Sequence, residues 1–340
     1  MTAIPVIPEC PGAEPAARLA QGAEARARAS RGLITAPGIY DIPADEYHRD
    51  PTPAPSLSAS IAHELLSRSP RHAWQAHPRL NPAHEPEHRA ELDIGHAVHS
   101  LVLGDERRFA VIDAADYRAG AARAAREAAY AAGAIPLLPH QYEATRAMAR
   151  ALRAQLEQHE ARDAFTQGQP ERTIAWREGD VWCRARLDWL PNTLTRATII
   201  TDLKSTTNAE PAAWSRSKLE AMGYDVQAAF YLRGLRALGH PDTLRFAFVV
   251  VEVDPPHALS VIGLPPAVMA LAEQKVEHAI ATWRECLRTN VWPAYPTRIC
   301  WADPTPWSEA RWAERVARDP KPTPAALEAA MAWQAPMENR

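Results

Sequence analysis

The chain has 340 residues, of which 46% are hydrophobic and 23% charged, and its formal net charge at pH 7 is −3. This composition is ordinary for a globular protein with a large core, and it excludes a uniformly basic nucleic-acid binder. Any contact with a polyanion therefore depends on a local patch or on metal ions.

The two ends of the chain differ in composition from its middle. Residues 1–35 are rich in Ala, Pro, Glu and Arg and contain almost no large apolar side chains, which predicts a flexible N-terminal arm. Prolines recur from about residue 301 onward, which predicts a Pro-rich C-terminal tail, or a loosely docked helix, over 301–340. We expect one folded domain over 36–300.

The sequence shows neither a membrane span nor a dense cysteine framework. No segment approaches the ~20 apolar residues that a bilayer span needs, and the first residues lack the pattern of a signal peptide. The four cysteines are Cys10, Cys183, Cys286 and Cys300. Disulfide and zinc frameworks have tighter spacing, so we expect reduced thiols in a cytoplasmic protein without membrane contact.

The first half of the expected domain has a helical pattern. A helix over 56–66 has Ser58 as a plausible cap, and Ser69-Pro70 ends it and begins the next segment. An amphipathic helix is expected over 91–103, and an Ala- and Arg-rich helical stretch, broken at its prolines, over about 119–160.

The hydrophobic period then changes from helical to alternating. Segments 172–177 and 181–189 flank Glu178-Gly179-Asp180, which predicts a β-hairpin. Further strands are expected over 197–204, 244–253 and 258–264, and further helices over 211–219, 224–238 and 266–289. Helices on both sides of a strand block predict an α/β or α+β fold with a central mixed β-sheet flanked by helices.

Asp202-Leu203-Lys204 ends the strand expected over 197–204. Because side chains alternate along a strand, Asp202 and Lys204 share one face and Leu203 points into the core. A carboxylate and an ammonium held side by side can hold a divalent metal and assist attack on a phosphate. An ordinary exposed ion pair could have the same sequence. The triplet therefore indicates a catalytic site only together with the other motifs.

Asp188 ends the second strand of the hairpin on its polar face. If the next strand runs antiparallel, Asp188 comes beside Asp202. Two carboxylates in contact both stay ionised only with a cation between them, and oxygen ligands suit Mg²⁺ or Mn²⁺. Glu171, at the start of the preceding strand, is a candidate third carboxylate. The alternative is a surface hairpin with solvated charges.

Two expected helices carry polar groups four residues apart, which places each pair on one helix face. On the first, Gly95 leaves space and His99 offers an imidazole nitrogen to a metal. On the second, Gln227 and Tyr231 offer an amide and a phenol that can hydrogen-bond a phosphate backbone or order the lysine. Polar positions of an amphipathic helix produce the same spacing without any function.

These motifs occur in the order Gly-x-x-x-His, Glu, Asp, Asp-x-Lys and Gln-x-x-x-Tyr. In this order the chain resembles the RecB-type branch of the PD-(D/E)xK nuclease superfamily, and more closely the phage and prophage exonucleases of the RecE type (exodeoxyribonuclease VIII). The similarity runs from about Gly38 to about Tyr295. It is carried by Gly38-Ile39-Tyr40, Tyr47-His48, Ser56-Leu57-Ser58, Ser69-Pro70, the segment from Leu92 to His99, the segment from Cys183 to Asp188, the segment from Thr201 to Thr207, the segment from Val226 to Tyr231, and Trp292-Pro293-Ala294.

The resemblance implies a restriction-endonuclease-like core with a Mg²⁺ site, in which Mn²⁺ can substitute. It implies that His99, Asp188 and Asp202 surround the metal, with Glu171 nearby as a further catalytic carboxylate. The family usually has Pro immediately before the hairpin aspartate, and this chain has Leu187. Proline there supplies no chemistry, so we expect activity to survive.

The resemblance also implies roles for the remaining motif residues. Lys204 positions or activates the attacking water, while Gln227 and Tyr231 shape the catalytic site. Related nucleases with iron–sulfur clusters carry a cysteine triplet near the end of the fold. Cys286 and Cys300 cannot supply such a triplet, so we expect no iron–sulfur cluster.

The resemblance implies action on double-stranded DNA ends, with 5′ to 3′ digestion of one strand that leaves 3′ overhangs for recombination. It also implies a single-strand annealing protein as partner and a ring-shaped homo-oligomer. Candidate DNA phosphate contacts are Arg68, Arg71, Arg184 and Arg186. The alternatives are a single-strand exonuclease or an endonuclease of the same superfamily, and a non-catalytic DNA-binding accessory protein. The presence of every charged motif position argues against the accessory protein.

Overall fold

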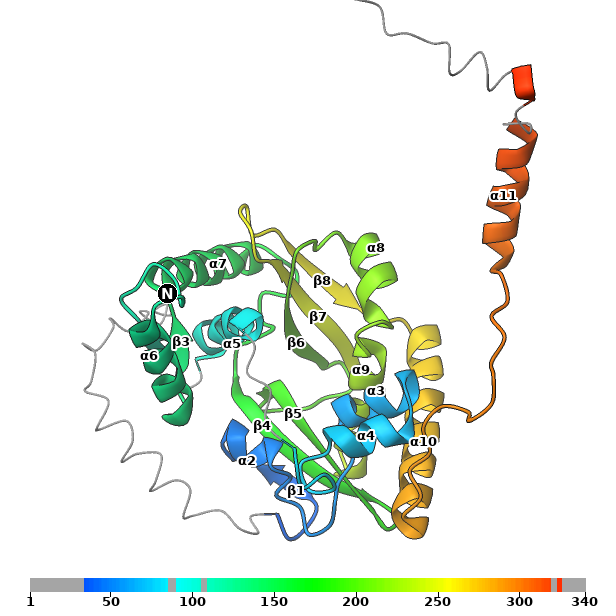
Figure 1. Ribbon diagram of the computed structural model, residues 1–340. Helices are drawn as coiled ribbons and strands as arrows, with labels where there is room; N and C mark the ends of the chain where they lie inside the picture. The colour runs from blue at the N-terminus through cyan, green and yellow to red at the C-terminus, as the bar shows by residue number, and fades with distance from the viewer. Residues whose placement is uncertain (1–33, 85–89, 105–108, 319–322, 326–340) are drawn as a thin grey trace, which may run out of the picture. The chain divides into compact units, whose positions relative to one another are not determined.

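The computed structural model describes residues 34–84, 90–104, 109–318 and 323–325 (Figure 1). Most of the expected N-terminal arm lies outside these residues. The chain divides into two units, Met1–Ala294 and Tyr295–Arg340. The described part of the second unit contains helix α11 (Pro306–Arg318), whose Trp307 and Trp312 are both more than half exposed.

The first unit is a mixed α/β fold, as the sequence predicts. Its strands are β1 (Gly38–Tyr40), β2 (Phe109–Val111), β3 (Ile135–Leu137), β4 (Gly168–Glu178), β5 (Val181–Pro191), β6 (Ile199–Thr206), β7 (Arg245–Glu252) and β8 (Leu259–Gly263). Its helices are α2 (Ala44–His48), α3 (Ala59–Ser67), α4 (Pro70–Ala76), α5 (Ala90–Leu103), α6 (Gly120–Ala131), α7 (Pro139–Glu157), α8 (Pro211–Trp214), the π-helix η1 (Ser215–Leu219), α9 (Tyr224–Ala237) and α10 (Pro266–Thr289).

Among the described residues, the strands form two three-stranded sheets and one two-stranded sheet. In the first, β4 pairs antiparallel with both β1 and β5. In the second, β7 pairs parallel with β6 and antiparallel with β8. The small third sheet is the parallel pair of β2 and β3. The strands therefore mix parallel and antiparallel pairing, but they are divided among separate ladders rather than joined in one central sheet.

Several local sequence signals have the expected structural effect. The Ser58 hydroxyl accepts a hydrogen bond from the Ile61 amide at 3.4 Å, so it caps α3. Ser69 caps α4 in the same way, and Pro70 takes the first helical position, where its missing N–H costs nothing. The β4–β5 hairpin closes through Gly179, whose φ of 63° falls in the left-handed region that favours glycine.

The Ala- and Arg-rich stretch after residue 119 is interrupted by a strand that the sequence pattern did not indicate. The expected break is confirmed, because α6 ends at Ala131 and Pro139 begins α7. Between them, the three residues of β3 pair with β2, which lies more than twenty positions earlier in the chain. Three residues are too few to show an alternating pattern, so only the distant partner defines this strand.

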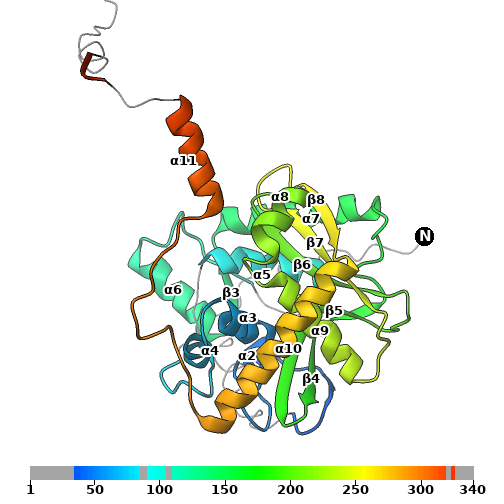
Figure 2. The ribbon, with the colours of Figure 1, turned by 90° about the vertical axis from the view of Figure 1, so that its right-hand side faces the viewer.

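Helix α9 lies against both large sheets and organises the main core. It contacts β4 and β5 of one sheet and β7 of the other. Figure 2 shows α10 lying across α9 and β5, which agrees with its packing against both elements. The core has a large aromatic part, in which Phe230 of α9 lies 4.8 Å from Trp176 and Phe246 lies 5.1 Å from Phe248, centroid to centroid. None of the helices in the described part of the chain has the length and apolar character needed to cross a membrane.

Replacing Gly234 by alanine tests the close packing of α9. A methyl group at Gly234 would lie 2.7 Å from side-chain atoms of Ile174 and Trp176, both fully buried. Alanine normally favours a helix, but overpacking a core costs about 1–3 kcal/mol. We expect Gly234→Ala to lower the free energy of unfolding by about that amount in urea denaturation. Gly120→Ala, in α6 with open space around it, is the matched control and should be neutral or stabilising.

Candidate metal and catalytic site

Five elements bring the predicted site residues into one region of the first unit. Helix α5 supplies His99, β4 supplies Glu171, and β5 supplies Asp188. Strand β6 supplies Asp202 and Lys204, and α9 supplies Gln227 and Tyr231. Side-chain contacts link the residues of the two large sheets at this place.

His99, Glu171 and Asp188 form a group that could hold a metal ion. Each offers one ligand atom, and these atoms all lie within 4.8 Å of one another. The Nδ1 atom of His99 is 3.5 Å from Oδ2 of Asp188. Carboxylate oxygens suit Mg²⁺ and Mn²⁺, whereas imidazole is a common ligand of transition metals. The donor set therefore fits a divalent cation without selecting magnesium by itself.

Glu171 reaches this group through an unusual backbone conformation. Its neighbours Pro170 and Arg172 pair with Trp189 and Leu187, so Glu171 stands opposite Asp188 across the hairpin. Its φ of 55° is rare for a residue other than glycine. Such conformations cost energy and persist where the surrounding structure holds them, often at functional sites.

Arg186 holds the Glu171 carboxylate from the same face of β5. Its Nε donates to Oε2 of Glu171 at 2.5 Å, and its Nη1 donates to the carbonyl of Ile42 at 2.7 Å. Two like charges directly opposite each other on a hairpin are destabilising. The guanidinium offsets part of the repulsion between Glu171 and Asp188.

Asp188 joins the two large sheets at the site. Strands β5 and β6 belong to different ladders, so the expected antiparallel pairing is wrong, although Asp188 still lies close enough to Asp202 for its charge to raise the pKa of Asp202. Instead, Oδ2 of Asp188 accepts a hydrogen bond from the backbone amide of Leu203 at 2.7 Å. The carboxylate thus meets β6 at the residue between Asp202 and Lys204. A hydrogen bond to the Asp188 side chain, and not a backbone ladder, therefore links β5 to β6 here.

Asp202 and Lys204 lie on one face of β6 and form an ion pair, as their alternation predicts. The Asp202 carboxylate is fully buried, and its Oδ1 also accepts a hydrogen bond from Nε2 of Gln227 at 2.6 Å. Leu203 between them is fully buried in the core. Asp202 lies outside the three-residue group described above, with its two oxygens turned to Lys204 and Gln227.

Burial and neighbouring charges shift the pKa values of several site residues. Burial, together with the charge of Asp188, raises the pKa of Asp202 to about 6, although Lys204 opposes this. Burial lowers the pKa of Lys204, but the carboxylates of Asp202 and Asp188 outweigh it and leave that pKa above its ordinary value. Lys204 is therefore a cation at neutral pH. Burial also raises the pKa of Tyr231 well above its ordinary value, so this residue remains a phenol.

Tyr224 is a site residue that the sequence reasoning missed. The Lys204 ammonium lies 4.9 Å from the centre of the Tyr224 ring, within the range of a cation–π interaction. A signal for it was present, because Tyr224, Gln227 and Tyr231 follow the spacing of one helix face. A methyl group at Gly95 would lie 3.5 Å from Oγ of Ser205, an ordinary van der Waals distance, so α5 packs beside β6 without requiring glycine there.

The burial of Arg184 contradicts its expected role as a DNA contact. It is 3% exposed, and its guanidinium donates to the backbone of Tyr47 and Ser56 and pairs with Asp50 at 3.1 Å. A phosphate cannot reach a side chain that is enclosed in this way, so its role in the fold is structural. Burial raises the pKa of Asp50, but hydrogen bonds from His77 and the charge of Arg184 outweigh it and lower that pKa overall.

The other three predicted arginines lie in different surroundings. Arg186 is bound to Glu171 as described above. Arg68 pairs with Glu64 at 3.1 Å and is half exposed. The guanidinium of Arg71 lies 4.4 Å from the centre of the Trp74 ring. Arg68 and Arg71 flank the α3–α4 junction, and their contacts with DNA stay predictions.

Asp188→Asn tests the metal group. An amide is a weaker metal ligand than a carboxylate, and the substitution also removes one negative charge from the group. Losing even an outer partner of a metal ligand costs about 10- to 100-fold in affinity, so we expect at least a tenfold loss of Mn²⁺ affinity by titration calorimetry. Asp180→Asn, at the exposed tip of the same hairpin, is the control and should bind Mn²⁺ like the wild type. Equal affinities for both variants would rule out this group as the metal site.

Arg184→Met tests the buried cluster around Asp50. Removing one partner of a buried ion pair costs about 3–5 kcal/mol, because the other charge is left uncompensated. Arg184 helps to lower the pKa of Asp50, so its contribution is present above about pH 4, where an unfolded aspartate ionises, and is lost as pH falls through the folded pKa. We expect the loss in unfolding free energy to be larger at pH 7 than at pH 3. The exposed Arg177→Met is the control, and an equally stable Arg184 variant would contradict this role.

The chain is similar to known proteins at the level of family and fold. Residues 59–301 match the family model described as a PDDEXK-like domain of unknown function (DUF3799). No curated protein matches the chain. A crystal structure described as "Putative exonuclease" from Eubacterium rectale matches with a TM-score of 0.51 and 14% identity, covering 78% of this chain and 97% of the other. At this identity the match concerns the fold alone.

A second solved structure, of SSO0001, has 14% identity and covers 62% of this chain and 97% of the other. Its TM-score of 0.24 is too low to support an argument. The family model spans well over half of the chain and includes every predicted site residue. The chain therefore belongs to the family of PDDEXK-like domains known as DUF3799.

Proposed function

We propose that this protein is a metal-dependent deoxyribonuclease that digests DNA from double-stranded ends. The observation that carries the proposal is the convergence of a His–Glu–Asp group with the buried pair of Asp202 and Lys204. A PDDEXK-like family and a neighbour described as an exonuclease support a nuclease. Mg²⁺ is the metal we propose, with Mn²⁺ as a substitute.

The metal would be held by His99, Glu171 and Asp188. When bound, a divalent ion supplies a lowered pKa for water and charge to neutralise phosphate oxygens. Arg186 keeps the Glu171 carboxylate turned toward the other two ligands. For Asp202 to act as a ligand as well, an oxygen now held by Lys204 or Gln227 would have to turn to the metal.

Lys204 would contribute a positive charge next to the metal site. Its raised pKa keeps the ammonium protonated, so it can donate hydrogen bonds and stabilise negative charge as it develops on water or phosphate. Asp202 fixes the position of this ammonium, and Gln227 in turn fixes Asp202. The surrounding burial strengthens each of these electrostatic interactions.

The polarity, product, partner and oligomeric state that we propose rest on the resemblance to RecE-type exonucleases. They are 5′ to 3′ digestion, a 3′ overhang for recombination by strand annealing, an annealing protein as partner and a ring-shaped homo-oligomer. The negative charge of the chain as a whole agrees with a protein that contacts DNA through local groups and metal ions.

Lys204→Ala tests the catalytic role. Removing one preorganised charge that stabilises a transition state costs at least about 10²-fold in rate. We expect Mg²⁺-dependent cleavage of linear duplex DNA to fall by that factor while DNA binding persists. Arg177→Ala, which removes an exposed cation from β4, is the control and should cleave normally. EDTA should abolish wild-type cleavage, and substantial residual Mg²⁺-dependent cleavage by the Lys204 variant would contradict the role.

The choice of substrate is tested with the wild-type protein. A double-strand exonuclease leaves closed circular DNA intact, whereas an endonuclease nicks it and a single-strand exonuclease prefers single strands. Duplex DNA labelled at the 5′ or the 3′ end then reports the polarity, because 5′ to 3′ digestion releases the 5′ label first. Absence of any metal-dependent cleavage would favour a non-catalytic DNA-binding protein instead.

A further inference from the structure

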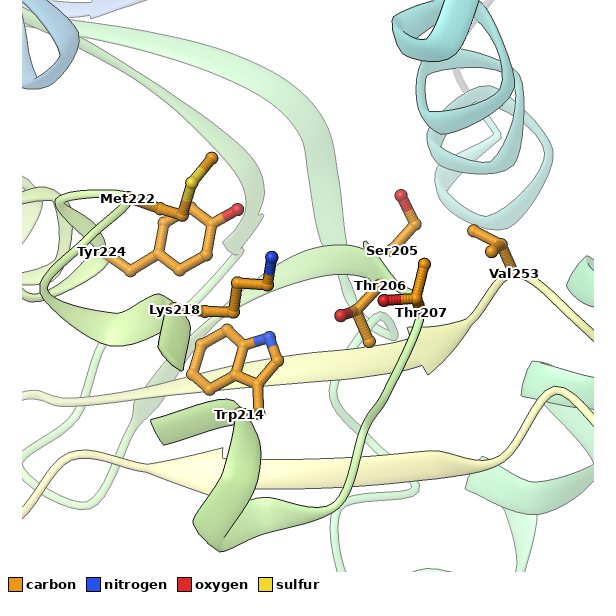
Figure 3. A pocket seen from close by; sticks show the side chains of 8 residues that line it. All are labelled: Ser205, Thr206, Thr207, Trp214, Lys218, Met222, Tyr224 and Val253. Atoms are coloured by element: carbon orange, nitrogen blue, oxygen red, sulfur yellow. The ribbon is translucent and has the colours of Figure 1, made fainter. Parts of the chain in front are cut away.

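We propose that a pocket beside Lys204 binds a backbone phosphate of the DNA strand that is being cut. This inference rests on the proposed nuclease function and assigns a substrate subsite to it. Figure 3 shows the pocket, with the Lys218 side chain reaching into the space between the aromatic rings and three hydroxyl-bearing residues. It is lined by Ser205, Thr206, Thr207, Trp214, Lys218, Met222, Tyr224 and Val253.

The pocket has room for a substrate group and opens at the surface. Its volume is about 260 Å³, slightly below the range of about 300–1,000 Å³ that is typical of small-ligand sites. Met222 on its rim is 52% exposed, and Thr207 is also exposed. A strand running over the surface could therefore place one of its groups inside without any opening motion.

The chemistry of the lining favours an anion. Lys218 is partly buried and has no ion-pair partner among the described residues. In the same part of the chain, the hydroxyls of Ser205 and Thr207 make no hydrogen bond. Within the described part of the chain, the residues that line the pocket include no carboxylate. An ammonium and two hydroxyls with free hydrogen-bonding capacity are suited to phosphate oxygens.

The aromatic residues of the pocket argue against a base as the bound group. Trp214 and Tyr224 stack on each other, with centroids 5.5 Å apart and planes 11° apart. Trp214 is 1% exposed. Since a stacked base needs an open ring face, Trp214 offers no stacking platform, and its own stacking on Tyr224 occupies one face of that ring.

The position of the pocket connects it to the catalytic group. Tyr224 both lines the pocket and contacts the Lys204 ammonium, so it joins the pocket to the proposed catalytic lysine. Lys218 belongs to the π-helix η1, and π-helical turns occur frequently at functional sites. A phosphate held there would be close to the phosphodiester at Lys204, so it would help to set the register of the strand.

The test compares Lys218→Met with Arg216→Met, its neighbour on η1 that is exposed and does not line the pocket. Both remove one positive charge, so only a specific contact distinguishes them. A hydrogen bond to a charged group contributes about 1.5–3 kcal/mol, which corresponds to about 10- to 100-fold in affinity. We expect Lys218→Met to raise KM for linear duplex DNA at least tenfold with little change in kcat. Arg216→Met should behave like the wild type, and Lys218→Arg should retain most of the affinity.

Two outcomes separate this inference from the proposed function. If the wild type cleaves DNA and the Lys218 and Arg216 variants have equal KM values, the pocket assignment falls while the nuclease assignment stands. If the wild type cleaves no DNA, fluorescence anisotropy with the same duplex decides: weaker binding by Lys218→Met alone supports the pocket, and equal binding by both variants overturns it. Unchanged thermal melting of both variants excludes a folding defect as the cause.

Discussion

The repulsion between closely placed carboxylates is the constraint around which the site is built. Glu171 and Asp188 stand opposite each other on one hairpin, and Asp188 also reaches the backbone of β6 next to Asp202. Three acidic groups in one partly buried region are unfavourable unless positive charge lies among them. The protein supplies part of that charge through Arg186 and Lys204. A divalent cation at His99, Glu171 and Asp188 would supply more.

The same carboxylates connect the fold to the proposed chemistry. Asp188 accepts a backbone hydrogen bond from Leu203 and so joins two sheets that share no ladder. Its position therefore depends on both sheets, and any ligand it holds is fixed relative to Lys204. Helix α9 completes the arrangement, because it packs on both sheets through its apolar face and turns Gln227 toward Asp202. The geometry of the candidate site and the packing of the core thus depend on the same few elements.

Much of the fold could be predicted, because its signals are local. The cap at Ser58, the hairpin at Gly179 and the bounds of α10 follow from turn chemistry and hydrophobic period, which need no distant partner. The strand β3 could not be predicted, since only its pairing with β2 defines it. The burial of Arg184 was equally invisible, because its partner Asp50 lies in a distant loop and an arginine on the polar face of a strand is normally exposed.

The sequence by itself determined the identity and order of the site residues, and the alternation along β6 that pairs Asp202 with Lys204. These follow from side-chain chemistry and from the period of a strand. Only the tertiary structure decided which carboxylates group with His99, because Glu171 comes opposite Asp188 through strand register and a left-handed backbone conformation. It also decided that Tyr224 and Lys218 lie next to Lys204, since side-chain distances across separate elements depend on packing and not on spacing along the chain.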